Sequence, residues 1–242
     1  MALTLVFAHL IATAMVALIG GPGFTQLAQL LSLDVEYNIP TTFAVGLFLL
    51  CAFLFRIAWS SQRNQAQRPH VWLVLAITFV LLAVDELCSI HEGLALPVRS
   101  ALGTSGLLYF AWVIPYTLGT LVLALYVTPT ILRLPAHIRK WFVAAALVFV
   151  GGCIGFEMLE GWARGLNSYA GDLAYAGFMV FEESCEMAGL IMLVYALLLL
   201  INCQQQEITI SFGHQLNRGQ ASRFVDAPRP GAASGEHSGD FG

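Results

Sequence analysis

Six long apolar stretches constrain this chain more than any other feature of its sequence. They cover roughly residues 2–19, 39–59, 71–90, 106–128, 141–160 and 173–201, with polar connectors between them. A helix needs about 20 apolar residues to cross a bilayer core of about 30 Å. Each stretch is close to that length, so the sequence predicts an all-α membrane protein whose fold is a bundle of six transmembrane helices.

The composition excludes most other classes of protein. Hydrophobic residues make up 58% of the chain and charged residues 11%, against about 45–50% and about 25% in soluble domains. Too few polar side chains remain to cover a water-facing surface, which excludes an ordinary soluble enzyme, a disordered protein and a coiled coil. The net charge of −4 also argues against nucleic acid as a partner. The expected partner is the lipid bilayer.

Two segments lie outside the six stretches. Residues 203–242 are polar and rich in Gly, Ser, Ala and Pro, which predicts a flexible tail after a six-helix transmembrane domain at 1–202. Phe24, Leu27, Leu30 and Leu31 follow the first stretch at helical spacing. This pattern predicts a short amphipathic helix on the outer surface.

Basic residues orient the predicted bundle. They flank the second and fourth connectors and recur in the tail: Arg56, Arg63, Arg68, Arg133, Arg139, Lys140, Arg218, Arg223 and Arg229. The opposite connectors carry only Arg99 and Arg164. The positive-inside rule therefore predicts a bacterial inner-membrane protein whose N-terminus and tail are cytoplasmic. No Lys or Arg precedes Arg56, so we expect the first stretch to be a retained helix and not a signal peptide.

Acidic residues lie where a simple bundle would not have them. The third, fifth and sixth stretches contain the segments VDELCSIHEG, GFEMLEG and VFEESCEMAG. They carry eight carboxylates and one histidine: Asp85, Glu86, His91, Glu92, Glu157, Glu160, Glu182, Glu183 and Glu186. Counted at 1.5 Å per residue from the cytoplasmic ends, Asp85, Glu157 and Glu186 lie roughly 21–24 Å across. The three helices therefore place acids in one layer, with Glu160, Glu182, His91 and Glu92 nearer the outer edge.

Helical phase brings pairs of these acids together. Asp85 and Glu92 are seven residues apart and would share one helix face, and Glu157 and Glu160 are three apart. Gly151, Gly152 and Gly155 form a face of small residues below Glu157, which permits close approach of a neighbouring helix.

An ionised carboxylate facing lipid costs roughly 2.5–3.5 kcal/mol, so either protons or a cation must compensate this layer. We expect Asp85, Glu157, Glu183 and Glu186 to be the inner ligands of a metal ion. Glu86, His91, Glu92 and Glu160 would be outer ligands, residues that hold the ligands in place, or proton carriers. The simpler alternative, water-exposed residues at helix ends, suits Glu92, Glu160 and Glu182.

The oxygen-rich ligand set favours Ca²⁺, Mg²⁺ or Mn²⁺, with iron as a further candidate. The Glu-x-x-His pattern of carboxylate-bridged di-iron bundles does not occur in the chain. A three-histidine zinc site is disfavoured because His70, His137, His214 and His237 belong to the other side.

Three functions fit this pattern. The first is a metal- or cation-binding membrane protein, including a metal-dependent redox enzyme or hydrolase. The second is a proton- or cation-coupled transporter or channel, because intramembrane acids often mark ion pathways. The third is an accessory subunit of a larger membrane complex, and a homo-oligomer is compatible with all three.

The combination of LAVDELCSIHEG, GFEMLEG and FEESCEMAG resembles a family of uncharacterised bacterial multi-pass inner-membrane proteins. The likeness covers most of residues 70–200. It implies the membrane topology and draws attention to the same acids, and it carries no assigned substrate or reaction.

Overall fold

The computed structural model describes residues 1–35, 37–62 and 69–225, and all regular structure in these ranges is helical. The chain divides into two units, Met1–Ile201 and Asn202–Gly242. The first unit contains all the acids of the three helical segments, so the following description concerns that unit.

Five helices are long and apolar enough to cross a membrane, which confirms a helical membrane protein. They are α3 (Ile39–Gln62), α4 (His70–Cys88), α6 (Val113–Ile131), α7 (Ala136–Arg164) and α8 (Tyr169–Val225), whose apolar part is Tyr169–Gln204. The first apolar stretch forms α1 (Ala2–Leu18), a helix of 17 residues that is shorter than these five. The predicted count of six crossings is therefore not confirmed.

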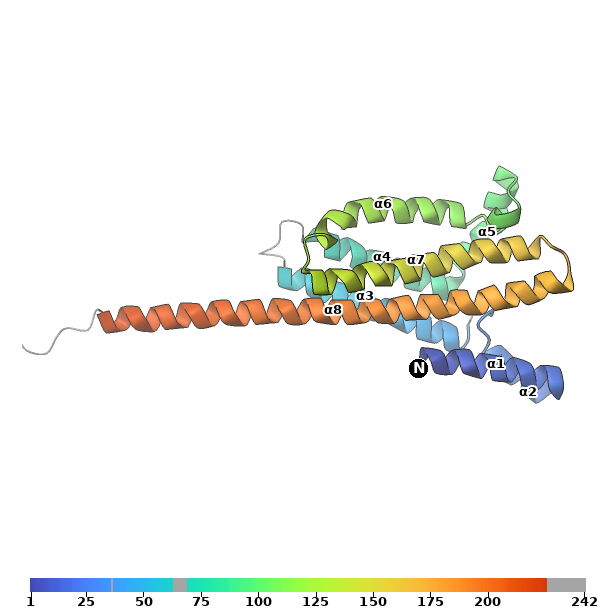
Figure 1. Cartoon of the computed structure of the whole chain (residues 1–242), viewed down its shortest axis with the longest axis horizontal. Helices are drawn as coiled ribbons and strands as arrows, with labels where there is room; N and C mark the ends of the chain where they lie inside the picture. Colours follow the sequence, from blue (N-terminus) through green and yellow to red (C-terminus); the bar gives the residue numbers. More distant parts are fainter. Residues whose placement is uncertain (36, 63–68, 226–242) are drawn as a thin grey trace, which may run out of the picture. The chain divides into compact units, whose positions relative to one another are not determined.

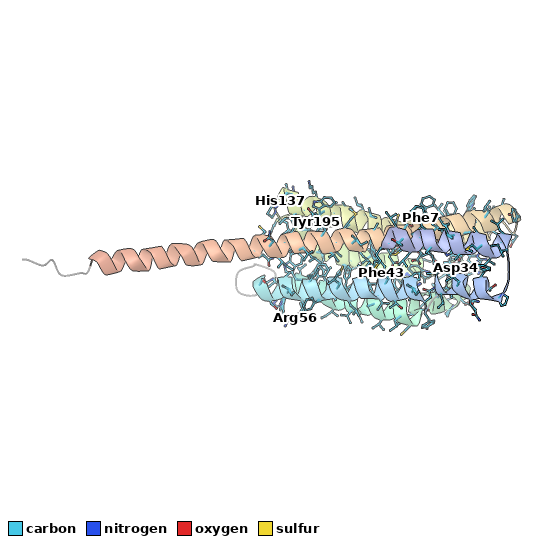
Figure 2. All side chains as sticks on the ribbon, turned by 90° about the horizontal axis from the view of Figure 1, so that it is seen from below. Phe7, Asp34, Phe43, Arg56, His137 and Tyr195 are labelled. Atoms are coloured by element: carbon cyan, nitrogen blue, oxygen red, sulfur yellow. The ribbon has the colours of Figure 1, made fainter. Side chains whose placement is uncertain are left out.

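The connections between helices alternate between the two ends of the bundle. In Figure 1 the α1–α2 turn, helix α5 (Ile90–Leu102) and the α7–α8 turn lie at one end, and the end of α3, the start of α4 and the α6–α7 link lie at the other. Figure 2 places Asp34 at the first end and Arg56 and His137 at the second. We refer to the first end as the outer end, following the charge distribution.

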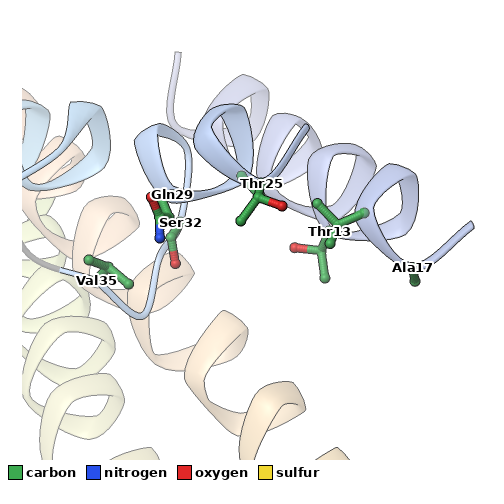
Figure 3. Close-up of a pocket in the computed structure, with 8 residues that line it drawn as sticks. Thr13, Ala17, Thr25, Gln29, Ser32 and Val35 are labelled. Atoms are coloured by element: carbon green, nitrogen blue, oxygen red, sulfur yellow. The ribbon is translucent and has the colours of Figure 1, made fainter. Parts of the chain in front are cut away.

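The predicted amphipathic helix is present as α2 (Pro22–Leu30), with Leu27 and Leu30 exposed. A groove of about 340 Å³ separates α2 from α1, and its lining includes Thr13, Ala17 and Thr25 (Figure 3). No carboxylate is among its lining residues.

Aromatic side chains fill the core where α3, α4 and α7 meet. Phe55 stacks on Trp72 with ring centroids 6.1 Å apart and lies 5.2 Å from Phe79. Trp72 in turn lies 5.9 Å from Phe142. Phe55 and Trp72 are almost completely buried. This apolar packing holds together three of the helices that carry or surround the acids.

The third and fourth crossings differ from the sequence prediction at their outer ends. Helix α4 ends at Cys88, because Ser89 adopts a left-handed conformation with φ of 48°. A separate helix, α5, and a short 3₁₀ turn, η1 (Gly106–Leu108), then precede α6. Pro115 consequently lies in the first turn of α6, where proline needs no kink.

The last helix extends beyond its apolar part, which ends at Gln204. Helix α8 continues to Val225, past residue 202, where the sequence predicted the transmembrane domain to end. The flexibility of the tail and its cytoplasmic location stay predictions, and residues 226–242 of that tail lie outside the described residues.

Candidate carboxylate and histidine site

The break between α4 and α5 creates the first part of the site. The Asp85 carboxylate, at the end of α4, accepts a hydrogen bond from the backbone N–H of His91 at 3.0 Å. That N–H is in the first turn of α5, where a helix leaves its amides without internal partners. Asp85 therefore caps the helix that follows it, and the expectation that Asp85 and Glu92 share one helix face is wrong.

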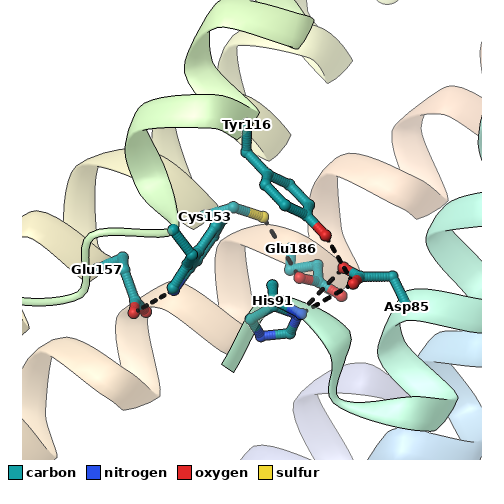
Figure 4. A network of polar contacts seen from close by, with 7 residues as sticks. Asp85, His91, Tyr116, Cys153, Glu157 and Glu186 are labelled. Atoms are coloured by element: carbon teal, nitrogen blue, oxygen red, sulfur yellow. Dashed lines mark hydrogen bonds and ion pairs between the residues drawn. The ribbon is translucent and has the colours of Figure 1, made fainter. Parts of the chain in front are cut away.

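The same capping places the imidazole of His91 beside Asp85. Nδ1 of His91 lies 3.1 Å from Oδ2 of Asp85, and the Tyr116 hydroxyl donates to Oδ1 of Asp85 at 2.7 Å. The ring of His91 also lies 4.9 Å from that of Trp112 and 6.4 Å from that of Tyr116. Three elements, α4, α5 and the start of α6, thus hold one imidazole in a fixed orientation (Figure 4).

The pKa of His91, which lies outside the five crossings, is raised above its ordinary value of 6.5. Burial by itself lowers this pKa. The hydrogen bond to Asp85 and the negative charges of Asp85, Glu157 and Glu92 act in the opposite direction and outweigh burial. The positive form of His91 is therefore favoured by its surroundings.

Trp112 links this histidine to α7. Its indole Nε1 donates to Oε1 of Glu157 at 2.8 Å, while its ring packs against His91. An indole N–H is a donor only, so the bond orients the Glu157 carboxylate without adding charge. Trp112 is buried, and through this bond it connects the start of α6 to α7.

Glu157 belongs to a cluster of three carboxylates. One oxygen from each of Glu157, Glu160 and Glu182 lies within 4.8 Å of the other two. At this separation two ionised carboxylates repel each other by about 3.5 kcal/mol at an effective dielectric constant of about 20. Three pairs of this kind cannot persist unless positive charge or protons compensate them.

Glu160 is the most buried member of the cluster. Its residue is 3% exposed, and its Oε1 has no hydrogen-bond partner. A buried polar atom without a partner costs roughly 1–3 kcal/mol. Arg164, one helical turn away on α7, does not supply one, because no ion pair within 4.0 Å joins the two residues in the described part of the chain.

Glu186 lies deeper along α8 and contacts α7. Its Oε2 accepts a hydrogen bond from Sγ of Cys153 at 3.3 Å, and its Oε1 is buried without a partner. The charges of His91 and Asp85 act on Glu186. Asp85, Glu157 and Glu186, which the sequence placed in one layer, therefore all lie around His91.

Close packing of α7 against α8 brings these groups together. A Cβ added to Gly152 would lie 2.5 Å from Cβ of Cys185, and one added to Gly189 would lie 2.7 Å from Cβ of Phe149. Gly151 and Gly155, by contrast, have open space around them. Among the three glycines of the predicted small-residue face, Gly152 is the one that α8 approaches closely.

The remaining predicted ligands are not members of the three-carboxylate cluster. Glu92 is exposed on α5, and Glu86 and Glu183 are half-buried. Glu182, which the sequence reading placed in the outer layer but not among the ligands, is a member of the cluster. Trp112 and Tyr116 were not expected at all, although their spacing of four residues puts both on one side of a helical segment.

The comparison with known families agrees with the resemblance noted in the sequence. Residues 2–201 match the family described as Domain of unknown function (DUF8692). The chain belongs to this family. No curated protein and no solved structure matches the chain. The family match covers all the acids and the histidine described above, and it assigns no activity to them.

Proposed function

We propose that this protein binds a divalent cation at Glu157, Glu160 and Glu182, in the outer half of its transmembrane bundle. The observation that carries the proposal is the convergence of three carboxylate oxygens within 4.8 Å of one another. The partnerless Oε1 of buried Glu160 supports it, because a bound cation would supply the missing partner.

The donor chemistry favours a hard cation. All three ligands are carboxylates, which suit Mg²⁺, Ca²⁺ and Mn²⁺ and also bind iron. Ligating carboxylates are commonly held by further hydrogen bonds, and Trp112 provides one to Glu157. In this proposal Asp85, His91 and Glu186 surround the site as proton carriers. The broader ligand set that includes Glu86, Glu92 and Glu183 stays a prediction.

Metal analysis of the purified full-length protein tests the cation site. We expect close to one divalent ion per chain, with Glu160→Gln and Glu182→Gln weakening Mn²⁺ affinity by at least about tenfold. Asp172→Asn, which changes an exposed acid at the same end of the bundle, is the matched control and should bind Mn²⁺ as the wild type does. Equal Mn²⁺ binding by all four proteins would refute the site.

Cation- or proton-coupled transport is the second candidate. It is favoured by the continuation of polar groups from the cluster past Trp112 to His91, Asp85 and Glu186. Ion flux into liposomes that is abolished by Glu160→Gln would favour transport. Bound metal without flux would favour a resident cation in a metal-dependent redox enzyme or hydrolase.

We further propose that the basic links and the tail face the cytoplasm of a bacterial inner membrane. With α1 as a sixth crossing, the N-terminus would also be cytoplasmic. Its 17 residues give about 26 Å of helix, so this crossing requires local thinning of the bilayer. A reporter fused before Met1 should be protected from an externally added protease, and cleavage of that reporter would instead place the N-terminus outside.

A further inference from the structure

We propose that cations reach the cluster of Glu157, Glu160 and Glu182 from the outer face through a port formed by Asp34, Arg164 and Tyr175. Asp34 attracts the cation and Arg164 opposes it. This inference rests on the proposed cation site and adds the route by which that site fills.

Three elements meet at the port. Asp34 is exposed and lies in the link between α2 and α3. The hydroxyl of Tyr175, near the start of α8, donates to Oδ1 of Asp34 at 2.7 Å. The guanidinium carbon of Arg164, at the end of α7, lies 3.8 Å from the centre of the Tyr175 ring. The exposed Asp34 and Arg164 thus both contact the phenol of Tyr175.

The port is adjacent to the buried oxygen of the cluster. Asp34 and Arg164 both act electrostatically on Glu160. Arg164 rests on Tyr175 instead of pairing with Glu160, so the Glu160 carboxylate stays directed toward Glu157 and Glu182. In this proposal a cation that arrives at Asp34 passes Tyr175 and Arg164 on its way to Glu160.

Two glycines mark close packing on either side of Arg164 in the sequence. A Cβ on Gly161 would lie 3.0 Å from the carbonyl oxygen of Gly106 in η1, and one on Gly171 would lie 2.7 Å from that of Ala163. Helix α7 is therefore packed closely against η1, and the turn between α7 and α8 is packed closely around Gly171.

The side of the cluster that carries Phe156 and Phe181 is aromatic. Phe156 of α7 stacks on Phe181 of α8 with ring centroids 5.7 Å apart, and Phe181 is exposed on the apolar surface. A hydrated ion would have to cross this apolar layer. The side with Asp34 offers charged and polar groups instead.

The two charged residues of the port should have opposite effects on the rate of cation association, because a charge beside a narrow site steers ions toward it or away from it. A purely structural role would not produce opposite signs. Association rates therefore test the port more directly than affinity does.

Tb³⁺, a luminescent ion that replaces Ca²⁺ at carboxylate sites, is a suitable probe. Trp112 contacts Glu157, so indole excitation should sensitise Tb³⁺ bound to full-length protein in uncharged detergent. Trp112→Phe should remove this signal and Trp162→Phe should retain most of it. Stopped-flow mixing at low salt then measures the association rate.

We expect Asp34→Asn to slow Tb³⁺ association about tenfold and Arg164→Gln to accelerate it several-fold. Asp34→Glu, which keeps the charge, and Arg99→Gln, which changes an arginine that lies over the ring of Tyr109, should stay within about twofold of the wild type. High salt should reduce the difference between Asp34→Asn and the wild type, because it screens exposed charges.

Failure of the port and failure of the site give different results. If the wild type does not sensitise Tb³⁺, or if Glu160→Gln binds it equally well, the cation site itself is wrong. If the wild type binds Tb³⁺ through Glu160 but Arg164→Gln fails to accelerate association, the port is overturned. The association rate of Arg164→Gln tests the port even if Asp34→Asn does not fold.

Discussion

Asp85 makes three polar contacts that join α4, α5 and α6. Its carboxylate accepts from the backbone N–H of His91 and from the Tyr116 hydroxyl, and it lies against the imidazole of His91. The residue is only 9% exposed, so each of these bonds replaces water that the carboxylate has lost. Hydrogen bonds to a charged group contribute more than neutral ones, and Asp85 is therefore the residue on which the geometry around His91 depends.

Tyr116→Phe removes one of these bonds without changing the ring. We expect the free energy of unfolding in detergent to fall by about 1.5–3 kcal/mol, the range for hydrogen bonds to charged groups. Tyr126→Phe on the same helix is the control, because Tyr126 is 41% exposed and its substitution should change stability by less than about 0.5 kcal/mol. Equal effects of the two substitutions would show that the Tyr116 bond contributes nothing.

The raised pKa of His91 determines how this residue's contribution to stability should depend on pH. Burial lowers the pKa of His91. The bond to Asp85 and the charges of Asp85, Glu157 and Glu92 raise this pKa by more than burial lowers it, so the pKa in the folded protein exceeds the ordinary 6.5. The protonated histidine then stabilises the folded state fully below about 6.5. This contribution is lost as pH rises through the raised pKa.

Unfolding of the wild type and of His91→Gln across this pH range measures the contribution. The difference in unfolding free energy between the two proteins should be largest below pH about 6.5 and should shrink above it. Tyr116 and Glu186 also lie near His91 and are unchanged in both proteins. A difference that grows with pH would contradict the raised pKa.

At the scale of elements, the seam between α7 and α8 positions the polar groups of both helices. Gly152 lies where a Cβ would be 2.5 Å from Cβ of Cys185, next to the bond between Cys153 and Glu186. Both atoms of this contact are close to the backbone, so neither helix can yield by rotating a flexible side chain. The separation of α7 and α8 is set at this glycine.

Gly152→Ala should therefore force the helices apart and lower the free energy of unfolding by about 1–3 kcal/mol. Gly151→Ala is an internal control of the same chemistry, because nothing lies within 4 Å of its Cβ position. That change should be neutral or stabilising by up to about 1 kcal/mol, since alanine favours helix more than glycine. Equal destabilisation by both changes would show that Gly152 has no special role in the seam.

At the scale of the whole molecule, the bundle combines an aromatic core with a polar outer half. Phe55, Trp72 and Phe79 pack together between α3 and α4, whereas Glu160 and Glu182 approach each other between α7 and α8. Mutual repulsion of the carboxylates opposes folding, and a bound cation would remove it. The stability of the folded chain should thus depend on the cation.

Mn²⁺ should raise the midpoint of thermal unfolding of the wild-type protein in a concentration-dependent way. At a free concentration 100 times the dissociation constant, the stabilisation is about 2.7 kcal/mol. Glu160→Gln should unfold at a higher temperature than the wild type without metal, because one charge of the cluster is gone, and should respond little to Mn²⁺. A wild type that is indifferent to Mn²⁺ would contradict this expectation.

Hydrophobicity alone predicted the five helices that are long and apolar enough to cross a membrane, because apolar length is a local property of the chain. It also placed Asp85, Glu157 and Glu186 at a common level, since depth follows from counting residues along a helix. It failed between residues 89 and 112. There Ser89, in a left-handed backbone conformation, lies between the end of α4 and the start of α5. The spacing of apolar residues along the sequence does not reveal such a break.

The sequence by itself determined a helical membrane protein with acids gathered toward one end. Bilayer thickness sets the length of each helix, and the helical rise turns a residue's position in the sequence into a position along the bundle. The tertiary structure decided which acids touch. Glu182 joins Glu157 and Glu160, Asp85 binds His91, and Asp34 reaches Tyr175 across 141 positions of sequence. Those pairings depend on the rotation and separation of whole helices, which side chains from several elements set together.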